Sequence, residues 1–387
     1  MVYLDNNATT PLDPAVAAKM TEFMNTSFGN PSSLYPIGRQ AKEALTEARE
    51  FVARSMGAQK GDITFTGSGT EADNQAIIGV MDALPDKNEF VTSTIEHPGI
   101  QETAVYLERK GYRITYVPVD KTGLLDMDAL RDAVTPQTAL VSVMHANNEI
   151  GTIQPIAEIA AIAHEKGALV HTDAVQSYGK LVWGVDDLGV DLLTVSGHKI
   201  YGPKGVGALY VRRGTPIRPF IHGGHQERGF RAGTENTSGI VGFGEAARIL
   251  PEKMTESLPR LERLAARLRE GLEAKIPKIH FNGHPVRRVH TTLSYAFLGL
   301  EAEAILLGLA TRDICVSTGS ACSEDSDDVS HVLKAIGLKP EFARSTIRMS
   351  LGRFNTDQDV DTVLTLLPEI VDKLRRISAW HPDEDEV

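Results

Sequence analysis

Short apolar runs alternate with amphipathic stretches over the first two thirds of the chain. Residues 38–56 place Ala41, Leu45, Ala48 and Val52 at helical spacing, and IQPIAEIAAIAHEKG shows the same period. The runs that predict strands are EFVTSTIEH, RITYVPV, TALVSVMHANNE, ALVHTD, DLLTVSGHK and VGALYV. Strands that alternate with helices predict an α/β domain with a mostly parallel sheet.

The pattern changes near residue 250. PEKMTESLPRLERLAARLREGLEAK predicts a long helix. After it come a strand (HTTLSYAFLG), a helix (EAEAILLGLA), a strand (STIRMSLG) and a last helix over about 357–378. We therefore expect a large α/β domain over 15–255 and a smaller α+β domain formed by 1–14 and 256–387.

Composition and charge argue against nucleic acids and membranes as partners of this chain. The chain has 387 residues, 42% of them hydrophobic, and a net charge of −11 from 51 acidic and 40 basic residues. An acidic chain is a poor ligand for nucleic acid or an anionic membrane, and no apolar run approaches the roughly 20 residues of a membrane span. The first residues, MVYLDNNATTPLDP, lack a basic segment followed by an apolar one, so we expect the cytoplasm.

The two cysteines differ in their surroundings. Two cysteines without a CxxC spacing do not make a disulfide framework or a zinc ribbon. Cys315, in RDICVST, has the apolar neighbours of a small buried residue. Cys322, in GSACSEDSDD, has small and polar neighbours, which predicts an exposed loop. Exposure favours a reactive thiol, although acidic neighbours raise the pKa of a thiol.

Polar side chains follow several of the predicted strands. These are Gly69 and Thr70 at a helix start, His97, Asn147 and Asn148, Asp173 and Gln176, and Ser196, His198 and Lys199. A single histidine or aspartate after a strand is more often a structural residue. Ligands of an open parallel sheet, however, bind at the carboxyl ends of its strands. The set as a whole therefore predicts a site.

Pyridoxal 5′-phosphate (PLP) is the cofactor that needs every member of this set. Its aldehyde bonds a lysine, for which Lys199 is the candidate. Its ring nitrogen is kept protonated by a carboxylate, here Asp173, and Gln176 is close enough in sequence to reach the phenolic oxygen.

The remaining members suit the phosphate and the substrate. Backbone N–H groups at a helix start and nearby hydroxyls bind phosphate, which assigns this role to Gly69, Thr70, Ser196 and His198. His97 is suited to stacking on the ring and moving protons. Arg348, in STIRMSLG, offers a planar bidentate donor for a substrate carboxylate.

Other cofactors find less support. GSGT is not the G-x-G-x-x-G of a dinucleotide site, and YGPKG matches a P-loop only in composition. His222-x-x-His225 has no accompanying ligand cluster, so we expect no metal site.

Together the motifs resemble the cysteine desulfurases of the NifS/IscS type, in the PLP-dependent class V aminotransferase family. The motifs that carry the resemblance are YLDNNATTPLDP, FGNPSS, GTEADN, EHPGI, NNEIGTIQPI, HTDAVQSYGK, SGHKIYGPKGVGALYVR, ERGFRAGTEN, STGSACS and IRMSLGRFNT. The resemblance implies fold type I, in which a large domain holds a mostly parallel seven-stranded sheet. It also places the catalytic cysteine loop on the smaller domain.

The resemblance implies an activity as well. L-cysteine would be converted to L-alanine, with its sulfur kept as a persulfide on Cys322. Lys199 would hold PLP, and His97 would act as acid and base above the ring. Asn148 and Arg348 would bind the substrate carboxylate, with Asn148 also near the cofactor.

The resemblance further implies partners. The family is homodimeric, and Thr234 in RAGTEN matches a threonine that reaches the phosphate from the partner subunit. The sulfur would pass to an acceptor such as an iron–sulfur scaffold, a tRNA-thiolation relay or a DNA-modification system.

Two departures and three alternatives accompany this reading. In TGSGTE, Gly67 and Ser68 are transposed relative to the family motif, and we expect this change to leave Thr70 in place. The second departure is His225, which stands where the family has glycine. The alternatives are a selenocysteine lyase, a class V aminotransferase, and a non-catalytic partner protein on the same fold. The thiol of Cys322 argues against a transaminase, which needs no nucleophilic sulfur.

Overall fold

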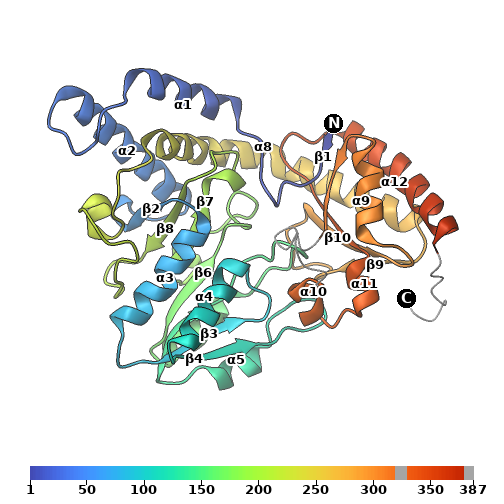
Figure 1. The fold of residues 1–387 in the computed structure, drawn as a ribbon, viewed down its shortest axis with the longest axis horizontal. Helices are drawn as coiled ribbons and strands as arrows, with labels where there is room; N and C mark the ends of the chain where they lie inside the picture. Colours follow the sequence, from blue (N-terminus) through green and yellow to red (C-terminus); the bar gives the residue numbers. More distant parts are fainter. Residues whose placement is uncertain (319–328, 379–387) are drawn as a thin grey trace.

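The large sheet has the expected architecture. The computed structural model describes residues 1–318 and 329–378 (Figure 1). Its seven-stranded sheet has the order β2 (Ile63–Thr66), β8 (Gly207–Val211), β7 (Leu192–Ser196), β6 (Leu169–Asp173), β5 (Thr138–Ser142), β3 (Glu89–Ser93) and β4 (Arg113–Val117). Only β8 runs antiparallel to its neighbours. The mostly parallel seven-stranded sheet predicted from the sequence is thus confirmed.

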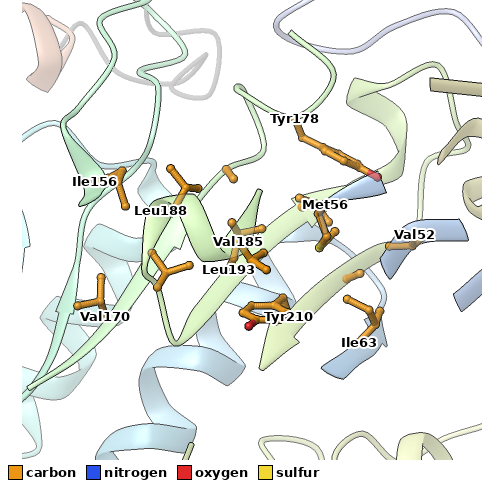
Figure 2. Close-up of a cluster of buried hydrophobic side chains, with 14 of the residues drawn as sticks. Val52, Met56, Ile63, Ile156, Val170, Tyr178, Val185, Leu188, Leu193 and Tyr210 are labelled. Carbon is orange, nitrogen blue, oxygen red and sulfur yellow. The ribbon is translucent and has the colours of Figure 1, made fainter. Parts of the chain in front are cut away.

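Helices cover both faces of this sheet. Neighbouring strand residues point to opposite faces, so Phe90 and Leu140 belong to one apolar cluster and Val91 and Val141 to another. The first cluster is covered by α3 (Gly69–Ala83) and α4 (Pro98–Arg109). The second, part of which Figure 2 shows, is covered mainly by α2 (Pro36–Ser55), α6 (Ile156–Glu165), α7 (Val185–Leu188) and the first half of α8 (Thr237–Lys275). The outer helices α1 (Pro14–Thr26) and α5 (Met127–Ala133) complete this part of the chain.

The long helix α8 starts at Thr237, well before the predicted start at residue 251. Its first turns contain glycines, which usually disfavour helix, and their role is close packing. A Cβ at Gly244 would lie 2.5 Å from the Cα of Ala48 on α2. Pro251 lies inside the helix rather than at its start. The early start was missed because contact with α2 outweighs helix propensity.

A second, four-stranded sheet lies at the C-terminal side of the molecule (Figure 1). Its order is β12 (Ser317–Thr318), β13 (Thr346–Ser350), β10 (Thr292–Phe297) and β9 (Ile279–Asn282). The helices of this part are α9 (Ala302–Ala310), α10 (His331–Ala335), α11 (Pro340–Arg344) and α12 (Asp357–Ile377). The predicted strands and helices of this region are confirmed; β9, β12, α10 and α11 were not predicted.

The N-terminal segment packs against this second part. Strand β1 (Val2–Tyr3) pairs in parallel with β11 (Ile314–Cys315), and Asp5 forms a bridge with Ser350. Cys315 is partly exposed, not fully buried as its neighbours suggested, because β11 is a short strand with one partner. None of the helices in the described ranges combines the length and apolarity needed to cross a membrane.

Helix α8 packs against a different hydrophobic core in each of its two halves. Residues up to Leu250 pack in the core of the large sheet, whereas residues from Leu261 onward pack in the core of the second sheet. The division into 15–255 and 1–14 with 256–387 remains our proposal, and this change of core supports it.

Candidate active site

One cavity of about 640 Å³ gathers most of the predicted site residues. It lies at the carboxyl ends of the parallel strands, where the sheet topology predicts a site. The predicted residues that line it are Gly69, Thr70, His97, Asn148, Asp173, Gln176, Ser196, His198, Lys199 and Arg348. Thr234 does not line this cavity but stands on an exposed loop. Cys322 lies outside the described residues.

The turn between β2 and α3 forms a helix start suited to an anion. Ser68 caps α3, since its hydroxyl accepts a hydrogen bond from the Glu71 N–H over 3.1 Å. The Gly67 N–H donates in return to Glu71 Oε2 over 2.9 Å. A Cβ at Gly69 would lie 3.1 Å from Val175 Cγ2, a tight contact that a glycine at this position avoids. The transposed Gly67 and Ser68 thus form a regular cap, and Thr70 lines the cavity.

His97 has a structural bond and an environment that keeps it neutral. It caps α4, and its Nδ1 accepts a hydrogen bond from the Gly99 N–H over 3.0 Å. Because Nδ1 accepts, the proton of the neutral ring is on Nε2. Burial lowers the pKa of the imidazole, against the opposing effect of Asp173. His97 is therefore a neutral imidazole that lines the cavity, ready to accept a proton only after Nε2 has given one up or the Gly99 bond has been lost.

Asp173 ends β6 within a group of buried carboxylates. Its Oδ1 accepts a hydrogen bond from the Val175 N–H over 2.8 Å. Burial raises its pKa, whereas the hydrogen bond from the Val175 N–H and the nearby positive charge of Lys199 lower it. Asp73 on α3 is also buried, and burial together with Asp173 raises its pKa. A cation placed beside Asp173 would satisfy this concentration of negative charge.

Lys199 is the last residue of a short 3-10 turn, Gly197–Lys199, that directly follows β7. Its Nζ donates hydrogen bonds to the backbone oxygens of Asn7 and Ala8, the latter over 2.7 Å. The neighbouring His198 contacts Thr9 through Nδ1 and Oγ1, 3.1 Å apart. Burial, then Lys199, lowers the pKa of His198 to about 4, so this ring is neutral. The end of β7 is thus fixed against the N-terminal segment.

Arg348 enters the cavity from the second sheet. It lies on β13, paired with Ser294 of β10 and Ser317 of β12. Its guanidinium donates to Asp5 Oδ1 over 2.9 Å and to the Asn148 backbone oxygen over 3.1 Å. Its Nε is buried and has no hydrogen-bond partner among the described residues. Arg348 lines the cavity, and a guanidinium there fits an anionic ligand such as a carboxylate.

Several residues in or next to the site were missed from the sequence, among them Asn7 and Lys180. Asn7 lines the cavity, and its Nδ2 donates to the Asn148 backbone oxygen (3.0 Å) and to Thr292 Oγ1 (2.9 Å). Lys180 hydrogen-bonds both Asn7 and Gln176. The amide and threonine run NNATT after a short strand was the only available signal for Asn7, and Lys180 gave none.

Glu149 was missed as well, although it follows Asn148 directly. It lines the cavity, and its Oε2 accepts a hydrogen bond from Ser330 Oγ over 2.6 Å. Burial raises its pKa to about 7 in spite of the nearby Arg348. Glu149 therefore joins the loop after β5 to the start of α10.

The described residues fit PLP. The cavity offers a lysine amine, a buried carboxylate without a cation bound to it among the described residues, a capped helix start and a neutral imidazole. In the described part of the chain, no three His, Cys, Asp or Glu side chains are grouped to hold a metal ion, and His225 is exposed away from the cavity. The roles of the individual residues remain predictions.

The fold and cofactor site define a PLP-dependent enzyme of fold type I. The chain belongs to the aminotransferase class V family, whose profile matches residues 2–363. It is 49% identical over 384 residues to a cysteine desulfurase IscS of Methanosarcina thermophila, covering 99% of this chain and 95% of that protein.

Solved structures agree with this membership. A NifS-like protein superposes with a TM-score of 0.91 at 39% identity, over 96% of this chain and 100% of that chain. A structure of SspA in complex with cysteine superposes with a TM-score of 0.81 at 37% identity, over 92% of this chain and 100% of that chain.

Proposed function

We propose that this chain is a PLP-dependent cysteine desulfurase, which converts L-cysteine to L-alanine and keeps the sulfur as a persulfide on Cys322. The observation that carries the proposal is a single cavity holding Lys199, Asp173, His97 and Arg348 in a chain 49% identical to a cysteine desulfurase. The reaction balances without an outside oxidant. L-cysteine and a protein thiol give L-alanine and a protein S–SH group.

Bound PLP supplies an electron sink for the bonds at the substrate α-carbon. Lys199 would hold the cofactor covalently and carry protons to and from the α-carbon once released from it. Asp173 would keep the ring nitrogen protonated. Its buried carboxylate, close to Asp73 and Glu96, gains most from such a cation.

The substrate would be held by its carboxylate and deprotonated at its thiol. Arg348 and Asn148 both line the cavity, and the Arg348 guanidinium donates to the Asn148 backbone oxygen. These two residues would bind the carboxylate. His97, neutral because of burial, would take the thiol proton at Nδ1 once its hydrogen bond from the Gly99 N–H is released. The phosphate would be bound at the start of α3 by Gly69 and Thr70, with Ser196 and His198 beside it.

The homodimer is part of the proposal. Thr234 is exposed and outside the cavity of its own subunit, which is the arrangement expected of a residue that serves the partner's phosphate. We also propose a cytoplasmic location and a protein sulfur acceptor, with an iron–sulfur scaffold as the first choice because several relatives are named IscS.

The test measures alanine formed from L-cysteine, with and without added thiol, in wild type and in Cys322→Ala. Cys315→Ala is the matched control, since Cys315 is the other cysteine and does not line the cavity. We expect thiol-stimulated alanine in wild type and in the control, and its loss in Cys322→Ala with PLP still bound.

Other outcomes separate the alternatives. Alanine formation unchanged in Cys322→Ala would remove the persulfide step and favour a lyase. Transfer of the amino group to a keto acid would favour an aminotransferase. A much faster reaction with selenocysteine than with cysteine, independent of Cys322, would favour a selenocysteine lyase. A protein that binds no PLP would be a non-catalytic member of the fold.

A further inference from the structure

Lys180 is a second lysine beside the cofactor cavity. It follows β6 in the turn that also carries Gln176. Its Nζ donates to Gln176 Oε1 over 2.8 Å and to Asn7 Oδ1 over 2.7 Å. Lys180 does not itself line the cavity, but both of its acceptor residues do. Lys180 can therefore influence the site only through the side-chain amides of Gln176 and Asn7.

The two hydrogen bonds from Lys180 fix the orientation of the Gln176 and Asn7 side-chain amides. An amide oxygen accepts and an amide nitrogen donates, so a donor on the oxygen fixes the orientation of the group. With Oε1 held by Lys180, Gln176 Nε2 donates one hydrogen to the Asn7 backbone oxygen over 2.9 Å. The second hydrogen on Nε2 remains for the cavity that Gln176 lines.

The environment makes Lys180 a hydrogen-bond donor more than a source of charge. Burial, then the positive charges of Lys199 and Arg348, hold the pKa of its amine below the usual lysine range. Lys199 donates to the backbone oxygen of Asn7, the residue whose side chain Lys180 contacts. A fully charged amine at this position would oppose two other cations.

We propose that Lys180 is a positioning residue that, by holding Gln176 Oε1, presents an N–H of Gln176 to the phenolic oxygen of bound PLP. The proposal rests on the proposed cofactor site but not on the identity of the substrate. Without Lys180 only the bond from Nε2 to the Asn7 backbone oxygen orients the Gln176 amide, so its second N–H is held less firmly toward the phenolic oxygen. Loss of a donor disfavours the negative form of that oxygen, so the pKa of the cofactor chromophore rises.

The test is a pH titration of the visible absorbance of the holoenzyme, without substrate. Lys180→Met removes the donor, and Lys180→Gln keeps a neutral N–H donor. Lys87→Met is the matched control, because Lys87 Nζ also donates to two oxygens, those of Thr138 and Gly167, away from the cavity. The titratable and cationic groups lining the cavity are unchanged in all three variants: Asp73, His97, Glu102, Glu149, Asp173, His198, Lys199, His331, Lys334 and Arg348.

We expect Lys180→Met to raise the apparent pKa of the chromophore by about 0.5 to 1 pH unit, Lys180→Gln to raise it by less, and Lys87→Met to leave it unchanged. In Gln176→Ala the same rise is expected, and adding Lys180→Met to it should change little, because Lys180 acts through Gln176. If Lys180→Met does not retain PLP, the same comparison is made with Lys180→Gln.

Two results would overturn the assignment alone: holoenzyme variants of Lys180 that titrate like wild type, or shifts that add fully in the double variant. A wild-type chain that binds no PLP would overturn the proposed function and this assignment together. Transaminase or lyase activity would change the proposed reaction and leave the assignment standing.

Discussion

The two sheets contribute to the cavity in different ways. The seven-stranded sheet supplies residues at or just beyond strand ends, such as Asp173 and Lys199, in turns fixed by hydrogen bonds to the backbone. The four-stranded sheet supplies Arg348 from within β13, between two paired strands. Strand ends give helix starts and turns that bring several side chains together, whereas a strand interior gives one side chain on a backbone paired on both sides. Chemistry on the first side and substrate placement on the second should therefore respond differently to substitution.

Lys199→Ala should have the largest effect on the strand-end side. Without the amine that bonds the cofactor, alanine formation should fall by about 10³-fold or more. The measurement is alanine formation together with a mass determination after borohydride reduction of the holoenzyme. Lys204→Ala, an exposed lysine of the same loop, is the control and should behave like wild type. Covalent retention of PLP in Lys199→Ala would contradict the assignment.

Asp173→Asn should have the second largest effect. The amide keeps an acceptor for the Val175 N–H but removes the charge that holds a ring proton. We expect kcat to fall by about 10²- to 10³-fold, with the protein folded. Steady-state kinetics and a thermal unfolding curve test this. Asp186→Asn, at an exposed carboxylate, is the control. A kcat within a few-fold of wild type would exclude the ring-nitrogen role.

Arg348→Lys tests the contribution of the four-stranded sheet, which is substrate placement. A lysine keeps the charge but cannot make planar paired hydrogen bonds, so KM for L-cysteine should rise about 10- to 100-fold while kcat changes less. Arg344→Lys, at an exposed position on α11, is the control. If kcat fell as strongly as in Asp173→Asn while KM stayed constant, the division between the two sides would be wrong.

Glu149→Gln should act on stability and its pH dependence, with the least effect on turnover. Glu149 contacts Ser330, and its folded-state pKa of about 7 lies above its unfolded value of 4.5. The native state therefore binds the extra proton between these values, and stability from this group falls as pH rises through that window. Relative to wild type, Glu149→Gln should gain at most about 3 kcal/mol between pH 5 and pH 8. Denaturant unfolding at both pH values tests this; a parallel pH dependence would refute it.

Features that depend on residues close together in the sequence could be predicted, whereas features that depend on contacts between distant segments could not. Alternating apolar runs and the strand-end rule predicted the large sheet and placed Asp173 and Lys199 in one cavity. The start of α8 was missed because its glycines are explained only by contact with α2. Asn7 and Lys180 were missed because their roles depend on hydrogen bonds between segments distant in sequence. Local patterns do not encode such pairs.

The N-terminal segment sets the order in which the cavity can be completed during synthesis. Asn6 and Asn7 are bound to Ser350, across sequence separations of 344 and 343 residues. The large sheet is complete once the ribosome has released Val211, but Asn7 reaches its final position only after Ser350 has emerged. A nascent chain would therefore have Lys199 and Asp173 in place without the segment that contacts Lys199. Cofactor capture in its final geometry therefore waits for contacts that close a loop of 343 residues.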